Sequence, residues 1–217
     1  MTAGKEGPDM PRTKTKRKKG SEFQASGAAT PARVLSRPIQ RRFFVGGTVA
    51  AVAAAVWLGF RPNPAECAFL DLAKAGRAAI ESLPLHPDLG NAHLQPGQRL
   101  PSGMRFPLSG PHADVWTEPG FYNVRQPPER LVHALEHGNV VIYYDKPPVA
   151  VLETLRQWAA LHPAMWAGVV VTPMPGLGEE VVLTAWRRML PLKTFEPALA
   201  AAFIDAFRGR GPENPVR

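Results

Sequence analysis

The sequence predicts an α+β domain in the second half of the chain, with a small mixed β-sheet and helices mainly on one face. Two observations predict it. Short apolar runs rich in β-branched residues, typical of buried strands, alternate there with amphipathic stretches of helical periodicity. A strand, a helix and a second strand come first, as in a parallel β-α-β crossover, and another strand follows a turn. We expect a β-α-β-β-α core, preceded by a proline-rich irregular segment and an N-terminal transmembrane helix.

The beginning of the chain carries all of its excess positive charge. Residues 1–42 contain 11 Lys and Arg against 3 Asp and Glu, whereas residues 43–217 contain 15 of each. The remaining chain therefore has no net charge that favours nucleic acid, and we exclude nucleic-acid binding. Few large apolar residues accompany the basic ones, so we expect residues 1–42 to be a disordered basic tail in the cytoplasm.

Residues 43–60 predict a membrane anchor. The segment has 18 residues and no charge. At about 1.5 Å per residue it reaches roughly 27 Å, close to the hydrocarbon thickness of a bilayer. Arg41 and Arg42 precede it, which predicts a single-pass protein of the cytoplasmic (inner) membrane, with its N-terminus in the cytoplasm and residues 61–217 outside. The paired arginines also fit a twin-arginine export signal, and both interpretations stay open. If the signal is cleaved, the domain is soluble in the periplasm.

Residues 61–92 are expected to form a juxtamembrane helix and a linker. Apolar residues recur at helical spacing over residues 65–83. Cys67 is the only cysteine, which excludes an intramolecular disulfide and a cysteine-rich metal site. Residues 84–128 contain nine prolines and little regular pattern. Because long irregular segments in compact domains are usually functional, we expect an ordered segment that carries site residues.

Residues 93–217 are the predicted extracytoplasmic α+β domain. Pro128 suits the first turn of a short helix, and Gly138 suits its C-terminal end. The elements expected after it are a strand over 140–144, a helix over 148–161, an antiparallel pair of strands over 168–172 and 180–186, and a helix over 197–207.

Half of the six histidines fall within residues 109–144. Two of them lie four residues apart on the expected short helix, so their Cβ atoms are roughly 5–6 Å apart on one face. Neutral imidazole is a good donor for zinc, copper, nickel or iron. The predicted metal ligands are His93, His112, His133 and His137. We expect Glu136 and Tyr122 to orient the ligands by hydrogen bonds.

Two other interpretations of these residues stay open. The histidines can be structural, bonded to loop carbonyls in a non-metal domain for interaction or assembly. The residues from His133 to His137 also fit the H-x-x-E-H string of inverted zinc peptidases, in which the glutamate, here Glu136, activates water. Those enzymes need a longer helix, whereas Gly138 ends this one. Glu136 is thus a catalytic candidate only in a metal-dependent hydrolase, and we expect binding instead of turnover.

Several sequence strings resemble one bacterial family. They are residues 109–112 (SGPH), 120–122 (GFY) and 131–138 (LVHALEHG), with weaker matches over 183–186, 203–205 and 210–213. They resemble the bacterial domain-of-unknown-function family 3105, over roughly the second half of the chain from about His93. The family pattern has a glycine after the tryptophan, where this chain has Arg187. The resemblance implies an exported or membrane-anchored domain and no particular reaction.

The donor set narrows the choice of metal. With a single cysteine in the chain, imidazole with carboxylate or phenol oxygen is the expected set, which suits Cu(II), Zn(II) or Ni(II). An anchored site outside the cytoplasm fits copper handling at the cell envelope. The sequence therefore predicts a membrane-anchored domain that binds copper or zinc through histidines. A protein partner is expected in the interaction-domain alternative.

Overall fold

The computed structural model describes residues 63–95, 97–100 and 103–217. The predicted basic tail (1–42) and the predicted anchor or export signal (43–60) lie outside these residues. None of the helices in the described ranges is long and apolar enough to cross a membrane.

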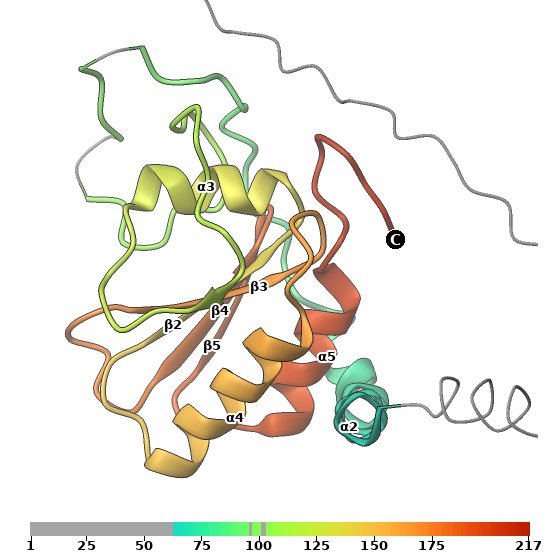
Figure 1. The fold of residues 1–217 in the computed structure, drawn as a ribbon. Helices are drawn as coiled ribbons and strands as arrows, with labels where there is room; N and C mark the ends of the chain where they lie inside the picture. Colours follow the sequence, from blue (N-terminus) through green and yellow to red (C-terminus); the bar gives the residue numbers. More distant parts are fainter. Residues whose placement is uncertain (1–62, 96, 101–102) are drawn as a thin grey trace, which may run out of the picture. The chain divides into compact units, whose positions relative to one another are not determined.

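The described residues form a mixed α+β fold with a five-stranded sheet and four helices (Figure 1). In chain order the elements are α2 (Pro64–Ile80), β1 (Gly120–Phe121), α3 (Pro128–Glu136), β2 (Val140–Tyr144), α4 (Val149–Leu161), β3 (Val169–Pro173), β4 (Val181–Ala185), β5 (Arg188–Leu192) and α5 (Pro197–Phe207). All six elements predicted from residue 128 onward are present. The helix predicted over 65–83 is α2, and it ends earlier, at Ile80.

The strands lie in the order β1-β3-β2-β4-β5. As predicted, β2 and β3 are parallel neighbours, which makes β2-α4-β3 a crossover unit. The predicted antiparallel hairpin of β3 and β4 is wrong. Instead, β4 pairs antiparallel with β2, on the side of β2 opposite to β3. Periodicity defines each strand but does not define its neighbour, because all three strands are apolar on both faces.

The two edge strands were not predicted from the sequence. β1 has only two residues and pairs in parallel with β3, within the segment expected to be irregular. β5 contains Pro191, and a proline inside an apolar run argues against a strand. At the edge of the sheet the missing N–H is tolerated, because only one side of the strand is paired.

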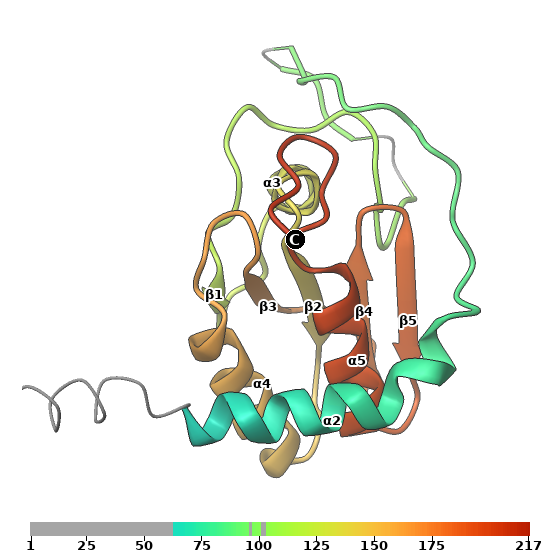
Figure 2. The same ribbon diagram turned by 90° about the vertical axis from the view of Figure 1, so that its right-hand side faces the viewer.

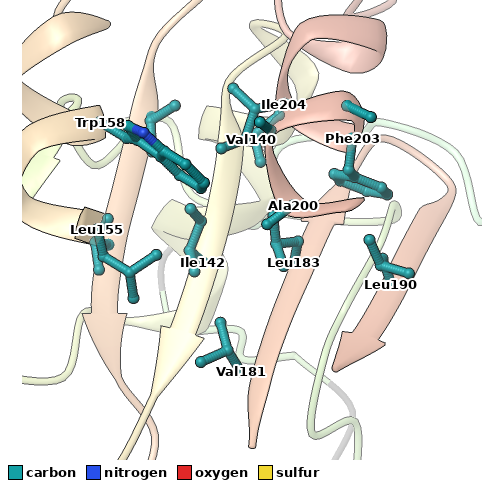
Figure 3. Packing of buried hydrophobic residues seen from close by; sticks show 14 of the residues in the cluster. Val140, Ile142, Leu155, Trp158, Val181, Leu183, Leu190, Ala200, Phe203 and Ile204 are labelled. Carbon is teal, nitrogen blue, oxygen red and sulfur yellow. The ribbon is translucent and has the colours of Figure 1, made fainter. Parts of the chain in front are cut away.

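The sheet is covered on both faces. Alternate residues of a strand point to opposite sides, so Val140 and Ile142 pack with α2, α4 and α5, whereas Val141 and Tyr143 pack with α3. Figure 3 shows the larger cluster, with Trp158 from α4 and Phe203 from α5 above the strands. Three of the four described helices therefore share one face, and α3 alone covers the other (Figure 1).

Helices α2 and α5 approach each other closely at Gly76. A Cβ atom at this position would overlap the backbone carbonyl of Ala198, near the start of α5. Glycine in the middle of a helix costs about 1 kcal/mol relative to alanine. Here it allows the two backbones to come together. Figure 2 shows α2 crossing α4 and α5.

Arg187 occupies a backbone conformation that favours glycine. Trp186 and Arg187 connect β4 to β5, and Arg187 has φ 59°. This positive φ gives a physical reason for a glycine at this position, as the sequence resemblance led us to expect. The arginine also binds the proline-rich segment: its Nε donates to the carbonyl of His86 at 2.8 Å, and Nη1 donates to Asp88 at 3.4 Å.

We expect Arg187→Ala to be less stable than Arg187→Gly. Both variants lose the contacts to His86 and Asp88, at a cost of about 1–2 kcal/mol. Only alanine keeps the penalty of about 1 kcal/mol for a left-handed conformation. Urea unfolding of both variants measures the difference. Equal free energies of unfolding would show that the turn relaxes out of the left-handed region once the side chain is removed.

Candidate metal centre

Helix α3 positions three of the polar residues. It begins with Pro128 in its first turn, and Gly138, with φ 88°, follows its C-cap His137. The predicted end of the helix at Gly138 is thus confirmed. Leu131, Ala134 and Leu135 pack on the sheet. On the rest of the helix, His133, Glu136 and His137 are only 2–4% exposed, because the irregular segment and the chain terminus cover them.

The proline-rich segment brings two more histidines to α3. His93 and His112 form an isolated parallel bridge. In it the Leu94 N–H donates to the His112 carbonyl at 2.7 Å, and the His112 N–H donates to the Ala92 carbonyl at 3.1 Å. The segment is therefore ordered at this point. Backbone hydrogen bonds between residues about twenty apart fix where both imidazoles lie.

The structure places one carboxylate and three imidazoles together. Donor atoms of His93, His112, His133 and Glu136 all lie within 4.8 Å of one another. The three ring centroids are 4.8–5.3 Å apart. His93 is exposed and the other three residues are buried. We call these four residues the inner set. This buried cluster of histidines and glutamate could hold a metal ion.

Two backbone carbonyls fix the orientation of two rings. Nδ1 of His112 is 2.9 Å from the Gly110 carbonyl, and Nδ1 of His133 is 2.8 Å from the Ala113 carbonyl. Since a carbonyl oxygen only accepts, both Nδ1 atoms carry the proton, and in the neutral rings Nε2 presents a lone pair. Metal-binding histidines usually donate their other N–H to a carbonyl or carboxylate in this way.

Nε2 of His112 is the most informative atom of the cluster. It is buried and has no hydrogen-bond partner among the described residues. Oε2 of Glu136 lies 2.9 Å away, yet the pair does not form a hydrogen bond, because with the proton on Nδ1 both atoms are acceptors. Two ligands of one ion meet in this manner, because each is directed at the ion instead of at the other. A buried lone pair beside a buried carboxylate needs a cation or a proton between them.

A second group of donors overlaps with the first. Donor atoms of His133, His137 and Glu213 also lie within 4.8 Å of one another, and Nε2 of His137 is 3.0 Å from Oε2 of Glu213. We call these three residues the outer set. The four predicted ligands therefore do not form one group: His93 and His112 belong to the inner set, His137 belongs to the outer set, and His133 belongs to both.

Glu213 reaches the cluster because the chain terminus packs on the end of α3. The Gly209 N–H donates to the Gly138 carbonyl at 2.8 Å. Gly138 and Gly211 lie so close that a Cβ atom on Gly138 would be 2.7 Å from the Gly211 nitrogen. Figure 2 shows residues 208–217, the C-terminal segment, looping beside α3.

Burial keeps the histidines of α3 neutral. Loss of solvent lowers the pKa of His133, and the neighbouring His112 and His137 lower it further. Burial also lowers the pKa of His137, against the opposing effect of Glu213 and Glu136. The unperturbed pKa of histidine is about 6.5, so both rings are neutral at pH 7 and able to bind a metal.

Two tryptophans enclose the histidines of α3. The Trp166 ring stacks on His137 with centroids 4.1 Å apart, and Trp116 lies 4.6 Å from His137 and 5.5 Å from His133. Sequence reasoning missed both tryptophans, as well as Glu213 as a donor. The only signal for Glu213 was its place in a weak match to the family pattern, and nothing in the sequence indicated that the terminus folds back on α3.

The described contacts of Tyr122 lie in its own loop and in the core. Its hydroxyl donates to the carbonyl of Glu118 at 2.8 Å, and its ring packs against the core under α3. Tyr122 thus stabilises its own loop, and its role in orienting a metal ligand stays a prediction.

The remaining two histidines lie away from the cluster. His86 accepts the Arg187 hydrogen bond through its carbonyl. His162 is 5% exposed and packs against Phe69 of α2, with ring centroids 4.6 Å apart. Burial, with the nearby cations of Arg208 and Arg217, lowers the pKa of His162 to about 4.

We expect His162 to make the metal-free protein sensitive to acid. Between the unperturbed pKa of about 6.5 and the folded-state value, the unfolded chain gains a proton that the folded chain does not, so stability falls as the pH falls. The loss amounts to about 3 kcal/mol at pH 4. In His162→Gln, which cannot titrate, we expect a shallower fall in the free energy of unfolding between pH 7 and pH 4. Parallel curves for the two proteins would contradict this.

The comparison with protein families agrees with the resemblance seen in the sequence. A model of the family described as "Protein of unknown function (DUF3105)" matches residues 93–217, more than half of the chain. The chain belongs to this family. The match begins at His93, and the matched DUF3105 region contains every residue of the inner and outer sets. No curated protein and no solved structure matches the chain significantly.

Proposed function

We propose that the DUF3105 domain binds one transition-metal ion, Cu(II) or Zn(II), through the inner set. The observation that carries the proposal is Nε2 of His112: a buried ring nitrogen with no hydrogen-bond partner among the described residues, beside the carboxylate of Glu136. A bound cation would satisfy both groups at once. It would also use the lone pair that His133 presents because its Nδ1 is bonded to a carbonyl.

The donor chemistry supports copper or zinc. Three imidazole nitrogens and one carboxylate oxygen are hard to borderline donors, which suit Cu(II) and Zn(II) better than a soft ion such as Cu(I). Metal–nitrogen distances are about 2.0–2.1 Å, so the donors of a tetrahedral site lie roughly 3.3 Å apart. Donor atoms within 4.8 Å of one another reach that spacing by small side-chain rotations.

Metal analysis of the full-length chain tests the proposal. The protein is purified without a histidine tag, stripped with a chelator, and challenged with Cu(II) and Zn(II) in turn. We expect one ion per chain in the wild type and none in the double variant His112→Ala/His133→Ala. His86→Ala is the matched control, because it removes a histidine outside both sets and should leave one ion bound. No uptake by a folded wild type would reject metal binding and favour structural histidines in an interaction domain.

One observation favours hydrolysis as a second candidate. The outer set has two histidines and a glutamate, which is the ligand composition of some zinc peptidases. The water-activating role would then fall to Glu136. Its side chain is only 5% exposed and lies against His112, so the carboxylate is not presented to solvent. Binding without turnover is therefore the better supported function.

We also propose that the domain lies outside the cytoplasm, anchored by residues 43–60 or released after cleavage there. The support is the uncharged segment with its basic flank. Cys67, the only cysteine, is exposed, so it can report the location. In spheroplasts, a membrane-impermeant maleimide should label Cys67 without lysis. Labelling that requires lysis would place the domain in the cytoplasm and count against copper handling at the envelope.

A further inference from the structure

The two sets of donors share one residue, and that residue has one free nitrogen. His133 belongs to both the inner and the outer set. Its Nδ1 is bonded to the Ala113 carbonyl at 2.8 Å, so it has only Nε2 to offer. One lone pair binds one ion. The sets are therefore mutually exclusive while this hydrogen bond is intact, and they cannot form a two-metal centre bridged by His133.

We propose that the domain holds its ion in two alternative positions that share His133, and that Glu213 is the ligand through which the ion leaves. The inner position uses His93, His112 and Glu136, and the outer position uses His137 and Glu213, each together with His133. This inference rests on the proposed metal binding and adds a route of release to it.

Burial distinguishes the two positions. The side chains of His112 and Glu136 are 0% and 5% exposed, whereas that of Glu213 is 44% exposed. A divalent ion is less shielded from water in the outer position, which favours retention in the inner set and exchange from the outer set. Each set contains one carboxylate, so an ion that moves from Glu136 to Glu213 keeps an anionic ligand throughout. His93 is also exposed, but it brings no carboxylate to the solvent side.

Distances within the cluster allow a stepwise transfer. The His133 ring lies 4.8 Å from the His112 ring and 4.6 Å from the His137 ring, so it stands between the two positions. His137 has a buried Nδ1 with no hydrogen-bond partner among the described residues, and its Nε2 already contacts Glu213. An ion bound to His133 can thus exchange its other ligands one at a time. It keeps at least one protein ligand throughout the transfer.

Glu213 is held in place by the C-terminal segment, not by α3 or by the proline-rich segment. Within residues 208–217, the Val216 N–H donates to the Gly209 carbonyl at 2.9 Å, and the Arg217 guanidinium binds Asp205 of α5 at 2.9 Å. These bonds hold both sides of Glu213 to the body of the domain, so its carboxylate is held at the cluster although it is exposed.

The first test measures the rate at which the full-length chain, loaded with Zn(II), loses the ion to a saturating chromophoric chelator in a stopped-flow instrument. We expect Glu213→Gln to keep one Zn(II) per chain and to release it about tenfold more slowly. The reason is that the variant lacks the charge-assisted interaction that stabilises the ion in the outer position during release. His93→Ala is the matched control, because it weakens the inner set only and should release Zn(II) faster than the wild type. An unchanged or increased rate in Glu213→Gln would overturn the inference.

A second test detects the outer position directly. In Glu136→Gln the inner set lacks its carboxylate, so we expect weaker Zn(II) binding that depends on Glu213. Adding Glu213→Gln to this variant should abolish the remaining Zn(II) binding. Thermal unfolding serves as the control that both variants are folded. If the double variant binds as well as Glu136→Gln, the outer position does not exist. If the wild type takes up no Zn(II), the proposed function fails first, and this inference fails with it.

Discussion

Replacing Glu136 by glutamine should separate metal binding from folding. We expect Glu136→Gln to lower the affinity for Cu(II) or Zn(II) by more than the roughly 10–100-fold that loss of an outer-shell partner costs. The free energy of unfolding of the metal-free protein should change by less than about 1 kcal/mol, because the new amide can donate a hydrogen bond to Nε2 of His112, which now has no partner among the described residues. Isothermal titration and urea unfolding with a chelator present measure the two quantities.

The structural alternative predicts a different result. If His112 is an imidazolium paired with Glu136 at 2.9 Å, the substitution leaves a buried charge without its partner. Breaking a buried pair in this way costs about 3–5 kcal/mol. A large loss of stability with no effect of metal in either protein would therefore reject metal binding. Glu129→Gln is the matched control, since Glu129 lies on the same helix outside both sets.

The contact between Gly138 and the C-terminal segment should have the largest effect on stability. We expect Gly138→Ala to lower the free energy of unfolding by about 2–4 kcal/mol, combining a left-handed backbone with overpacking. Gly138 has φ 88°, and the added Cβ atom would be 2.7 Å from the Gly211 nitrogen and 3.1 Å from the Trp166 carbonyl. These neighbours are backbone atoms, so they cannot move aside as a flexible side chain would.

A second glycine provides the control for this substitution. Gly178 has φ 62°, and a Cβ atom there would meet nothing within 4 Å. Gly178→Ala carries the backbone cost alone, about 1–2 kcal/mol. The difference between the two variants, measured by urea unfolding, gives the packing contribution of the terminus. Equal losses would mean that residues 208–217 do not pack on α3 in solution. In that case the role of Glu213 would lose its structural basis.

Local patterns were sufficient to predict the elements that are apolar and well bounded. Pro128 and Gly138 marked the ends of α3, and the run of β-branched and aromatic residues marked β2 (Val140–Tyr144). They were insufficient for the two edge strands. β1 has only two residues, too few to show a periodicity, and β5 contains Pro191, which a strand accepts only at a sheet edge. Whether β5 is at an edge depends on the pairing of β4 with β2, which no local pattern contains.

The candidate site divides in the same way. Helical spacing alone places His133 and His137 on one face, four residues apart. The single cysteine of the chain limits the expected donors to imidazole with carboxylate or phenol oxygen. The fold determines which imidazoles meet. Hydrogen bonds between residues 92–94 and His112 bring the loop histidines to Glu136, and the contact of Gly138 with Gly211 brings Glu213 to His137.

The sequence by itself determined the type of each long element, the α+β class, the family and the kind of ligand that the domain offers. The elements, the class and the kind of metal ligand follow from side-chain chemistry and from periodicity over a few neighbouring residues, whereas the family follows from the resemblance of strings such as residues 131–138. The tertiary structure alone decided the order of the strands and the division of four histidines into two sets that share His133. Both are contacts between residues far apart in the chain, and such contacts are set by packing and by backbone hydrogen bonds that local sequence does not encode.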